Sequence, residues 1–338
     1  MTSTVPNFFQ RAGNHALNAN PPTGLDMHLT KRGSDWLWAV FSVFGVLLVI
    51  YTILFFVAEL KNAKRMTRYA LAAPFIITLF EFFGYFIYAS NLGWTGIQAE
   101  FNNVKVDPSI TGEHPGVRQI FYAKYIAWFL SWPSLLYLIE LVGISTTSES
   151  NDISAMDLIH SLLVQIIGTE FWIVSLLIGA LMHSSYKWGP FVFGVVTMLI
   201  MQFLFIKRQI FDLKVRGFTA CMYITANIVV WLYFICWGLA DAGNKIQNDG
   251  EAVFYGVLDI CLFVVLPAYL LFIEMRYGKV PFFSLKKDSF NRDEENEENE
   301  DDFVKESAPN SIRASGETAV PDIAARAAQE TEQVEAQS

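Results

Sequence analysis

The chain has 338 residues, of which 53% are hydrophobic, 15% are aromatic and only 17% are charged. Soluble domains carry about 25% charged residues, so this composition excludes a typical water-soluble enzyme and indicates a lipid-facing surface. The net charge of -9 combines two unlike regions. From Asp288 onward there are fifteen acidic and four basic residues, whereas the preceding 287 residues carry eighteen acidic and twenty basic residues. The acidity therefore belongs to a C-terminal tail.

Apolar runs of about twenty residues, the length that crosses about 30 Å of hydrocarbon as a helix, recur along the chain. They predict an all-α membrane protein with seven spanning helices. The predicted spans are residues 35–59, 69–90, 119–142, 158–182, 188–206, 218–240 and 252–275. Most connections are short, so consecutive helices are expected to pack as neighbours in a bundle. The long connection at 91–118 is expected to form a short hairpin lid that includes residues 104–106.

The N-terminal residues 1–33 are polar and contain no apolar core of a cleavable signal peptide, so the first span is expected to be an uncleaved signal. Three cysteines, Cys221, Cys236 and Cys261, lie inside apolar runs and never at C-x-x-C spacing. We interpret them as small hydrophobic residues and expect neither a metal site nor a disulfide framework.

Basic residues flank the two ends of the predicted spans unequally. Twelve Lys and Arg lie beside one set of ends and six beside the other, and cytoplasmic loops retain the excess. We therefore expect the N-terminus outside and the C-terminus in the cytoplasm. The predicted domains are an outer segment at 1–34, a seven-helix bundle at 35–276 and a cytoplasmic acidic tail at 277–338. The tail is expected to be disordered because it has too little apolar surface to offset its ordering entropy.

Ionisable side chains are costly inside a membrane span, so each one marks a candidate functional site. Glu81, Lys124 and Asp259 are predicted at similar depths and form the candidate intramembrane polar cluster. We expect an ion pair between Lys124 and Asp259, with Glu81 nearby. In the alternative, Lys124 snorkels to the outer interface and Asp259 accepts hydrogen bonds from tyrosines. Glu140 and Glu274 lie near the cytoplasmic span ends, where solvated carboxylates are expected.

Three aromatic-rich stretches resemble the microbial rhodopsins, which implies a microbial rhodopsin-like bundle. They are residues 122–133 (YAKYIAWFLSWP), 231–239 (WLYFICWGL) and 254–263 (FYGVLDICLF). In that family a carboxylate on the third helix accepts the Schiff-base proton, and a lysine on the seventh helix binds retinal. The resemblance places Ala127 at the proton-acceptor position and Phe263 at the retinal-lysine position. It also aligns Asp259 with the family's seventh-helix aspartate and Lys124 with an arginine.

Two of these replacements remove the groups on which the family's photochemistry depends. Phenylalanine offers no amine for a Schiff base, and alanine offers no proton acceptor. We therefore predict that covalent retinal and light-driven pumping are absent, and we expect no cofactor. Five aromatic side chains are predicted to line a vestigial pocket, with ordinary core packing as the alternative. They are Tyr85, Trp128, Trp132, Tyr233 and Trp237.

Longer stretches are similar to the fungal opsin-related proteins, and within them to the small plasma-membrane heat-shock proteins of yeasts. The stretches are 20–28 (NPPTGLDMH), 31–38 (KRGSDWLW), 91–96 (NLGWTG), 116–122 (GVRQIFY) and 237–241 (WGLAD). The resemblance implies a stress-induced, non-enzymatic protein of the plasma membrane that restrains the plasma-membrane proton ATPase. The implied partners are that ATPase and membrane lipids, and no nucleic acid is expected.

A passive ion or proton channel or transporter is the alternative function, with Glu81, Lys124 and Asp259 as its polar path. It has weaker support because the sequence shows neither a ring of charges nor a pair of discontinuous half-helices. A G-protein-coupled receptor is disfavoured, since no Asp-Arg-Tyr ends the third predicted helix and no Asn-Pro-x-x-Tyr occurs in the seventh.

Overall fold

The computed structural model describes residues 14–101, 116–146 and 155–278. The chain separates into two units, Met1–Leu285 and Lys286–Ser338, and the second unit lies outside the described residues. The expected disorder of the tail and residues 104–106 of the expected hairpin lid also fall outside these ranges, so both stay predictions.

Seven helices in the described part of the chain are long and apolar enough to cross a membrane. This confirms the predicted all-α, seven-helix membrane fold. The helices are α2 (Lys31–Leu60), α3 (Arg65–Ala89), α4 (Ala123–Thr146), α5 (Ala155–Leu181), α6 (Trp188–Ile206) and α7 (Gly217–Trp237), with α8 (Asn248–Asp259) and α9 (Leu266–Tyr277) together forming the seventh span. A single short helix, α1 (Ala16–Ala19), precedes them in the described residues.

Several spans are extended by tighter or wider turns. A 3-10 turn, η3 (Ser185–Lys187), precedes α6, and the π-helical turn η4 (Lys207–Asp212) follows it. The π-helical turn η5 (Gly238–Ala242) extends α7, and the π-helical turn η6 (Ile260–Val265) joins α8 to α9. Three of these turns contain a buried polar side chain: Lys187 in η3, Gln209 in η4 and Asp241 in η5.

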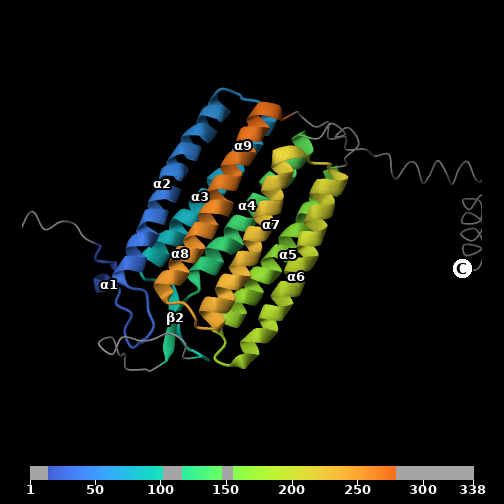
Figure 1. The fold of residues 1–338 in the computed structure, drawn as a ribbon. Helices are drawn as coiled ribbons and strands as arrows, with labels where there is room; N and C mark the ends of the chain where they lie inside the picture. Colours follow the sequence, from blue (N-terminus) through green and yellow to red (C-terminus); the bar gives the residue numbers. More distant parts are fainter. Residues whose placement is uncertain (1–13, 102–115, 147–154, 279–338) are drawn as a thin grey trace, which may run out of the picture. The chain divides into compact units, whose positions relative to one another are not determined.

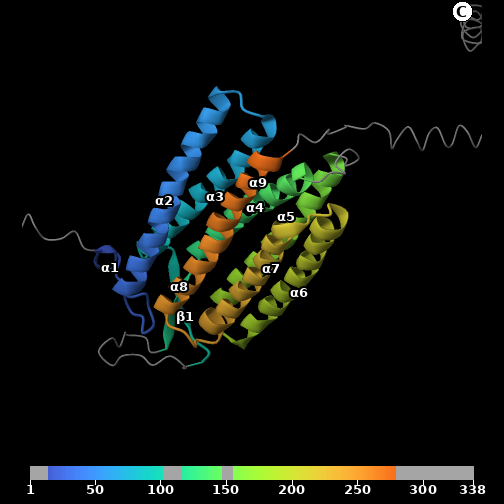
Figure 2. The same cartoon turned by 45° about the horizontal axis from the view of Figure 1, so that its top comes forward.

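The seven spans lie side by side as a bundle (Figure 1). Consecutive helices pack together from α2 to α6, and the seventh span packs against α2 and α7 through α8 and against α3 and α4 through α9. Figure 2 shows the orange seventh span crossing in front of α3 and α4. The central position of the seventh span brings its polar residues into contact with several helices.

A two-stranded antiparallel hairpin caps one end of the bundle. It pairs β1 (Trp94–Gln98) with β2 (Val117–Phe121), and Trp94 lies opposite Phe121. The predicted start of the third span at residue 119 was therefore too early. Residues 119–121 belong to strand β2, and α4 begins only at Ala123. The backbone of Met27 adds two hydrogen bonds to β2, at 3.2 and 2.8 Å, so the segment before α2 is fixed beside the hairpin.

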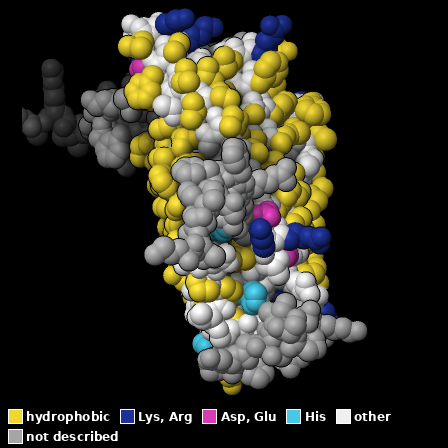
Figure 3. All heavy atoms as spheres, turned by 90° about the vertical axis from the view of Figure 1, so that its left-hand side faces the viewer, with side chains coloured by type: hydrophobic (Ala, Val, Ile, Leu, Met, Phe, Trp, Pro, Cys, Tyr) yellow, Lys and Arg dark blue, Asp and Glu magenta, His cyan; other side chains and the backbone are white. Residues whose placement is uncertain are grey.

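The outer surface of the helices is apolar, as expected for lipid contact. On the face drawn in Figure 3, hydrophobic side chains form a broad band, and Lys and Arg gather at its upper edge. We call the end with β1 and β2 the hairpin end of the bundle. The opposite end, which carries the connections at 61–64 and 213–216, is called the basic end.

Candidate functional site

Asp259 ends α8 in the middle of the seventh span and accepts hydrogen bonds from three other spans. Its Oδ1 accepts from Trp128 Nε1 of α4 at 3.0 Å and from the Tyr233 hydroxyl of α7 at 2.5 Å. Its Oδ2 accepts from the Tyr85 hydroxyl of α3. All four side chains are buried. Three donors therefore stabilise the carboxylate where water is excluded, as the hydrogen-bonded alternative for Asp259 predicts.

The predicted ion pair between Lys124 and Asp259 is wrong. Lys124 Nζ lies 3.2 Å from Asp241 Oδ2 and forms a second ion pair with Glu251. The lysine does not snorkel either, since it is only 4% exposed. The seventh span begins at Asn248, four residues earlier than predicted, which places Glu251 in its first turn near the start of α4. Asp259 is eight residues further along, about 12 Å deeper at 1.5 Å per residue.

Arg118 extends this network from the hairpin. Its Nη2 lies 2.6 Å from Glu251 Oε2, and its Nη1 donates to Asn244 Oδ1 at 2.8 Å and to the Ile246 carbonyl at 2.7 Å. The Tyr125 hydroxyl donates to Asp241 Oδ2 at 2.6 Å. We name Arg118, Lys124, Asp241 and Glu251 the hairpin-end charge cluster.

The hairpin-end charge cluster contains two cations and two anions, so its formal charges sum to zero. Its four side chains are between 0% and 4% exposed. The Lys124 ammonium also lies 4.4 Å from the centre of the Tyr255 ring, which adds a cation–π contact. Burial of four charges is tolerated because each one has an oppositely charged partner and hydrogen bonds. The cluster ties β2 and α4 to the ends of the sixth and seventh spans.

Sequence reasoning missed three members of this cluster. Arg118, Asp241 and Glu251 were placed in connections or at span ends, where charged residues are ordinary. A signal was present, because a lysine inside a predicted span requires a nearby carboxylate. Asp241, Asp249 and Glu251 are the acidic residues that flank the last connection, at the same membrane face as Lys124.

Glu81 of α3 is 0% exposed, and neither of its carboxyl oxygens has a hydrogen-bond partner among the described residues. The Ser131 hydroxyl of α4 is close enough to interact with it but does not reach hydrogen-bond geometry. Glu81 lies one helical turn from Tyr85, which contacts Asp259. Glu81 therefore borders the Asp259 site rather than the hairpin-end charge cluster, and the predicted three-residue cluster divides into two.

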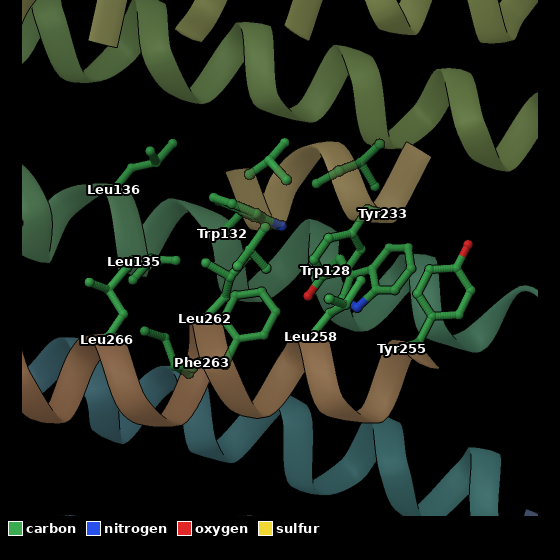
Figure 4. Close-up of a cluster of buried hydrophobic side chains, with 14 of the residues drawn as sticks. Trp128, Trp132, Leu135, Leu136, Tyr233, Tyr255, Leu258, Leu262, Phe263 and Leu266 are labelled. Carbon is green, nitrogen blue, oxygen red and sulfur yellow. The ribbon is translucent and has the colours of Figure 1, made fainter. Parts of the chain in front are cut away.

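Phe263 lies in the π-helical turn η6 and is 1% exposed. Its ring packs edge-to-face against Trp132, with 5.7 Å between centroids. Figure 4 shows both rings among the buried side chains between the seventh span and α4. Ala127, also buried, faces Gly84 of α3, where an added Cβ would lie 2.5 Å from the alanine Cβ. Helices α3 and α4 therefore approach closely between Gly84 and Ala127, and a larger side chain at Gly84 would collide with Ala127.

The five aromatic residues predicted to line a vestigial pocket serve different contacts. Trp128, Tyr85 and Tyr233 bind Asp259, whereas Trp237 donates to the Leu176 carbonyl at 3.0 Å. Trp132 lines a cavity of about 60 Å3 between α4, α5, α6, α7 and the seventh span, and the other four do not line it. These side chains mainly form hydrogen bonds and core packing.

Glu140 and Glu274 are 1% and 2% exposed, so the expectation of solvated carboxylates was wrong. Arg208 lies 2.7 Å from Glu140, and Gln209 donates to Glu140 at 2.8 Å. Both come from η4, which continues the fifth span beyond its predicted end at 206. Glu274 accepts a hydrogen bond from Ser145 of α4. Side chains at the basic end thus replace the water expected there.

The sequence model of a family described as "Bacteriorhodopsin-like protein" matches residues 36–273 of this chain. The chain belongs to the bacteriorhodopsin-like family. Among solved structures, this bundle is similar to Acetabularia rhodopsin I, with a TM-score of 0.59 and 24% sequence identity over 76% of this chain and 99% of that one. This likeness concerns the fold.

Two fungal proteins with higher sequence identity say more about the family of this chain. The chain is 60% identical to the 30 kDa heat shock protein of Saccharomyces cerevisiae, over 95% of this chain and 96% of the relative. It is 36% identical to the opsin-like protein carO of Fusarium fujikuroi, over 76% of this chain and 80% of that protein. The chain is thus an opsin-related, multi-pass membrane protein, as its sequence motifs predicted.

Proposed function

We propose that this chain is a non-photoactive, stress-response protein of the plasma membrane that restrains the plasma-membrane proton ATPase through protein contacts, without enzymatic activity. The stress role is supported by 60% identity to a heat shock protein along almost the whole chain. The link to the ATPase rests on the resemblance to the plasma-membrane heat-shock proteins of yeasts. Seven membrane spans are consistent with the proposed location.

The observation that carries the non-photoactive part is the side chain at position 263. Retinal binds opsins through a Schiff base that needs a protein amine, and the buried Phe263 packs on Trp132 instead. At the proton-acceptor position, Ala127 fills the close approach to Gly84. The cavity beside Trp132 has a volume of about 60 Å3, well below that of small-molecule sites, which is about 300–1,000 Å3. These residues do not fit covalently bound retinal.

Retinal titration tests this part. Purified full-length protein is mixed with all-trans retinal, treated with borohydride and denatured. We expect no visible absorption band from a protonated Schiff base and no retinal retained after denaturation. One equivalent of retinal fixed to the protein would refute the proposal, because it would require an amine that the site lacks.

Crosslinking in native membranes tests the proposed partner. The full chain and a version that ends at Lys287 are crosslinked, purified and analysed by mass spectrometry, and ATP hydrolysis is measured in membranes with and without the protein. We expect crosslinks to the proton ATPase and slower hydrolysis when the protein is present. Absence of the ATPase from both samples, with unchanged hydrolysis, would refute the regulatory role.

One observation favours the alternative of a passive proton path. Glu81 is a fully buried carboxyl group without a hydrogen-bond partner in the described residues, and such groups in membrane spans often mark proton pathways. Proton flux down a pH gradient in liposomes separates the two functions. A flux that Glu81→Gln abolishes would support the channel, and no flux above that of empty liposomes would support the regulator.

A further inference from the structure

The basic end of the bundle contains a cavity that no contact described above uses. It lies where α4 ends, α7 begins and α9 ends, and its volume is about 510 Å3. Small-molecule sites in proteins have volumes of about 300–1,000 Å3, so the cavity is large enough for a ligand. It lies at the end of the bundle that is predicted to face the cytoplasm.

The connection between α6 and α7 presents two cationic side chains to this cavity. Leu213 and Val215 are 1% and 6% exposed, whereas Lys214 and Arg216, which alternate with them, are exposed and line the cavity. The backbone amides of Leu213 and Val215 each donate at 2.9 Å to a carbonyl group of η4. The segment is thus held in place, including the left-handed φ of 52° at Lys214, a conformation that is costly for a residue other than glycine.

Arg216 has no protein anion beside it in the ranges that the structure describes. The ion pairs seen between residues of those ranges involve Arg68, Arg118, Lys124 and Arg208, and none of them includes Arg216. Arg208, from the turn that precedes this connection, is already bound to Glu140. The Arg216 guanidinium carries five N–H donors and is available to an anion from outside the bundle.

The remaining wall of the cavity is both polar and aromatic. The hydroxyls of Thr219 and Tyr269 lie 3.0 Å apart, and either one can be the donor, so the pair retains one hydrogen for another acceptor. Phe218 and Tyr277 also line the cavity and are 65% and 61% exposed. Aromatic rings concentrate at the membrane–water interface, which indicates that this cavity opens at the level of lipid headgroups.

We propose that this cavity binds the phosphate-bearing headgroup of an anionic phospholipid of the cytoplasmic leaflet. That leaflet is rich in anionic lipids, and basic pockets at this level bind their headgroups. The guanidinium of Arg216 matches the geometry of phosphate oxygens, with Lys214 adding a second positive charge. Phe218 and Tyr277 lie where the first carbons of the acyl chains would pass. This apolar wall favours a lipid over a soluble phosphate.

Native mass spectrometry of the purified full-length protein tests the proposal, with palmitoyl-oleoyl phosphatidylserine as the anionic probe and the matching phosphatidylcholine as the neutral one. We expect a tight phosphatidylserine site without a comparable phosphatidylcholine site. Lys214→Gln/Arg216→Gln is expected to weaken phosphatidylserine binding about 30-fold, at about 1 kcal/mol for each cationic side chain.

A matched double variant, Lys61→Gln/Arg65→Gln, removes two exposed positive charges from the same end of the bundle but outside the cavity. It is expected to retain phosphatidylserine binding. Equal losses in both double variants would show that only the general surface charge attracts the lipid, and would overturn the site. Undiminished binding after Lys214→Gln/Arg216→Gln would overturn it as well.

Two further measurements complete the test. Glycerophosphoserine has the headgroup without acyl chains, and we expect it not to displace the lipid; displacement at equal concentration would reveal a soluble-anion site and overturn the lipid assignment. Thermal unfolding in the same detergent checks the fold of each variant. If the double variant unfolds, Arg216→Gln alone is used in its place, because it changes a single exposed side chain. This single variant is expected to bind phosphatidylserine about fivefold more weakly.

Discussion

Lys124→Met perturbs the hairpin-end charge cluster at its centre. The substitution keeps a long unbranched side chain but removes one of two cations, so the remaining buried charges sum to -1. Lys124 is 4% exposed and pairs with both Asp241 and Glu251, so water cannot replace the lost ammonium. Removal of one partner from a buried ion pair costs about 3–5 kcal/mol. We expect the free energy of unfolding to fall by about this amount, together with a loss of protein from the membrane.

The measurement is equilibrium unfolding in mixed micelles, followed by tryptophan fluorescence. Lys124→Met/Asp241→Asn restores a neutral cluster and is expected to recover most of the lost stability. Lys124→Met/Asp259→Asn makes the same chemical change at a carboxylate that the lysine does not contact, and should be no more stable than Lys124→Met. Rescue by Asp259→Asn but not by Asp241→Asn would refute the pairing. An unchanged unfolding curve for Lys124→Met would refute the argument from desolvation.

Three further predictions concern packing and hydrogen bonding around Phe263, Ala127 and Asp259, each measured by the same unfolding assay. Phe263→Ala should lower the free energy of unfolding by about 3–5 kcal/mol, because the ring is 1% exposed. Phe272→Ala, at a 61% exposed position on the same span, should change it little. Equal effects of the two substitutions would contradict the observed packing of Phe263. Gly84→Ala should lower the free energy of unfolding by about 1–3 kcal/mol. The double variant Gly84→Ala/Ala127→Gly should regain this stability, because it removes the 2.5 Å contact between the two Cβ atoms. Absence of rescue would contradict the contact between Gly84 and Ala127 as the source of the loss. Tyr85→Phe should cost about 1–3 kcal/mol by removing a donor from its buried carboxylate acceptor, and a neutral result would mean that water takes the hydroxyl's place.

The seven spans were predictable because the bilayer fixes the length of an apolar helix, and this requirement acts locally in the sequence. Their ends were less predictable. Residues 119–121 are apolar enough to continue a helix, but they pair with β1 across the long connection. The seventh span begins at Asn248, where polar residues precede the apolar run. Side chains from neighbouring segments shield these residues, and hydropathy does not register that shielding.

The error over Lys124 shows why the site was harder to predict than the fold. Depth counting from a start at 252 placed Asp259 opposite the lysine, whereas the observed start shifts Glu251 into that position. Pairing also depends on how each span is rotated about its axis, which a single sequence does not fix. Glu140 carries the same lesson, because its partner Arg208 belongs to a π-helical turn that extends the fifth span. The role of Asp259 was predictable as an alternative that did not name its tyrosines, whereas Tyr85 and Tyr233, which bind it, were predicted to line a pocket.

The order of synthesis gives the hairpin-end charge cluster a consequence for assembly. Arg118 and Lys124 leave the ribosome before their carboxylate partners, which follow 117 to 133 residues later. The third span must therefore enter the bilayer carrying a lysine that nothing yet neutralises. The buried position of Lys124 becomes favourable only when the last two spans supply Asp241 and Glu251. We therefore expect the bundle to reach its folded state only at the end of translation. A chain that stopped before Asp241 would lack both carboxylates that pair with Lys124.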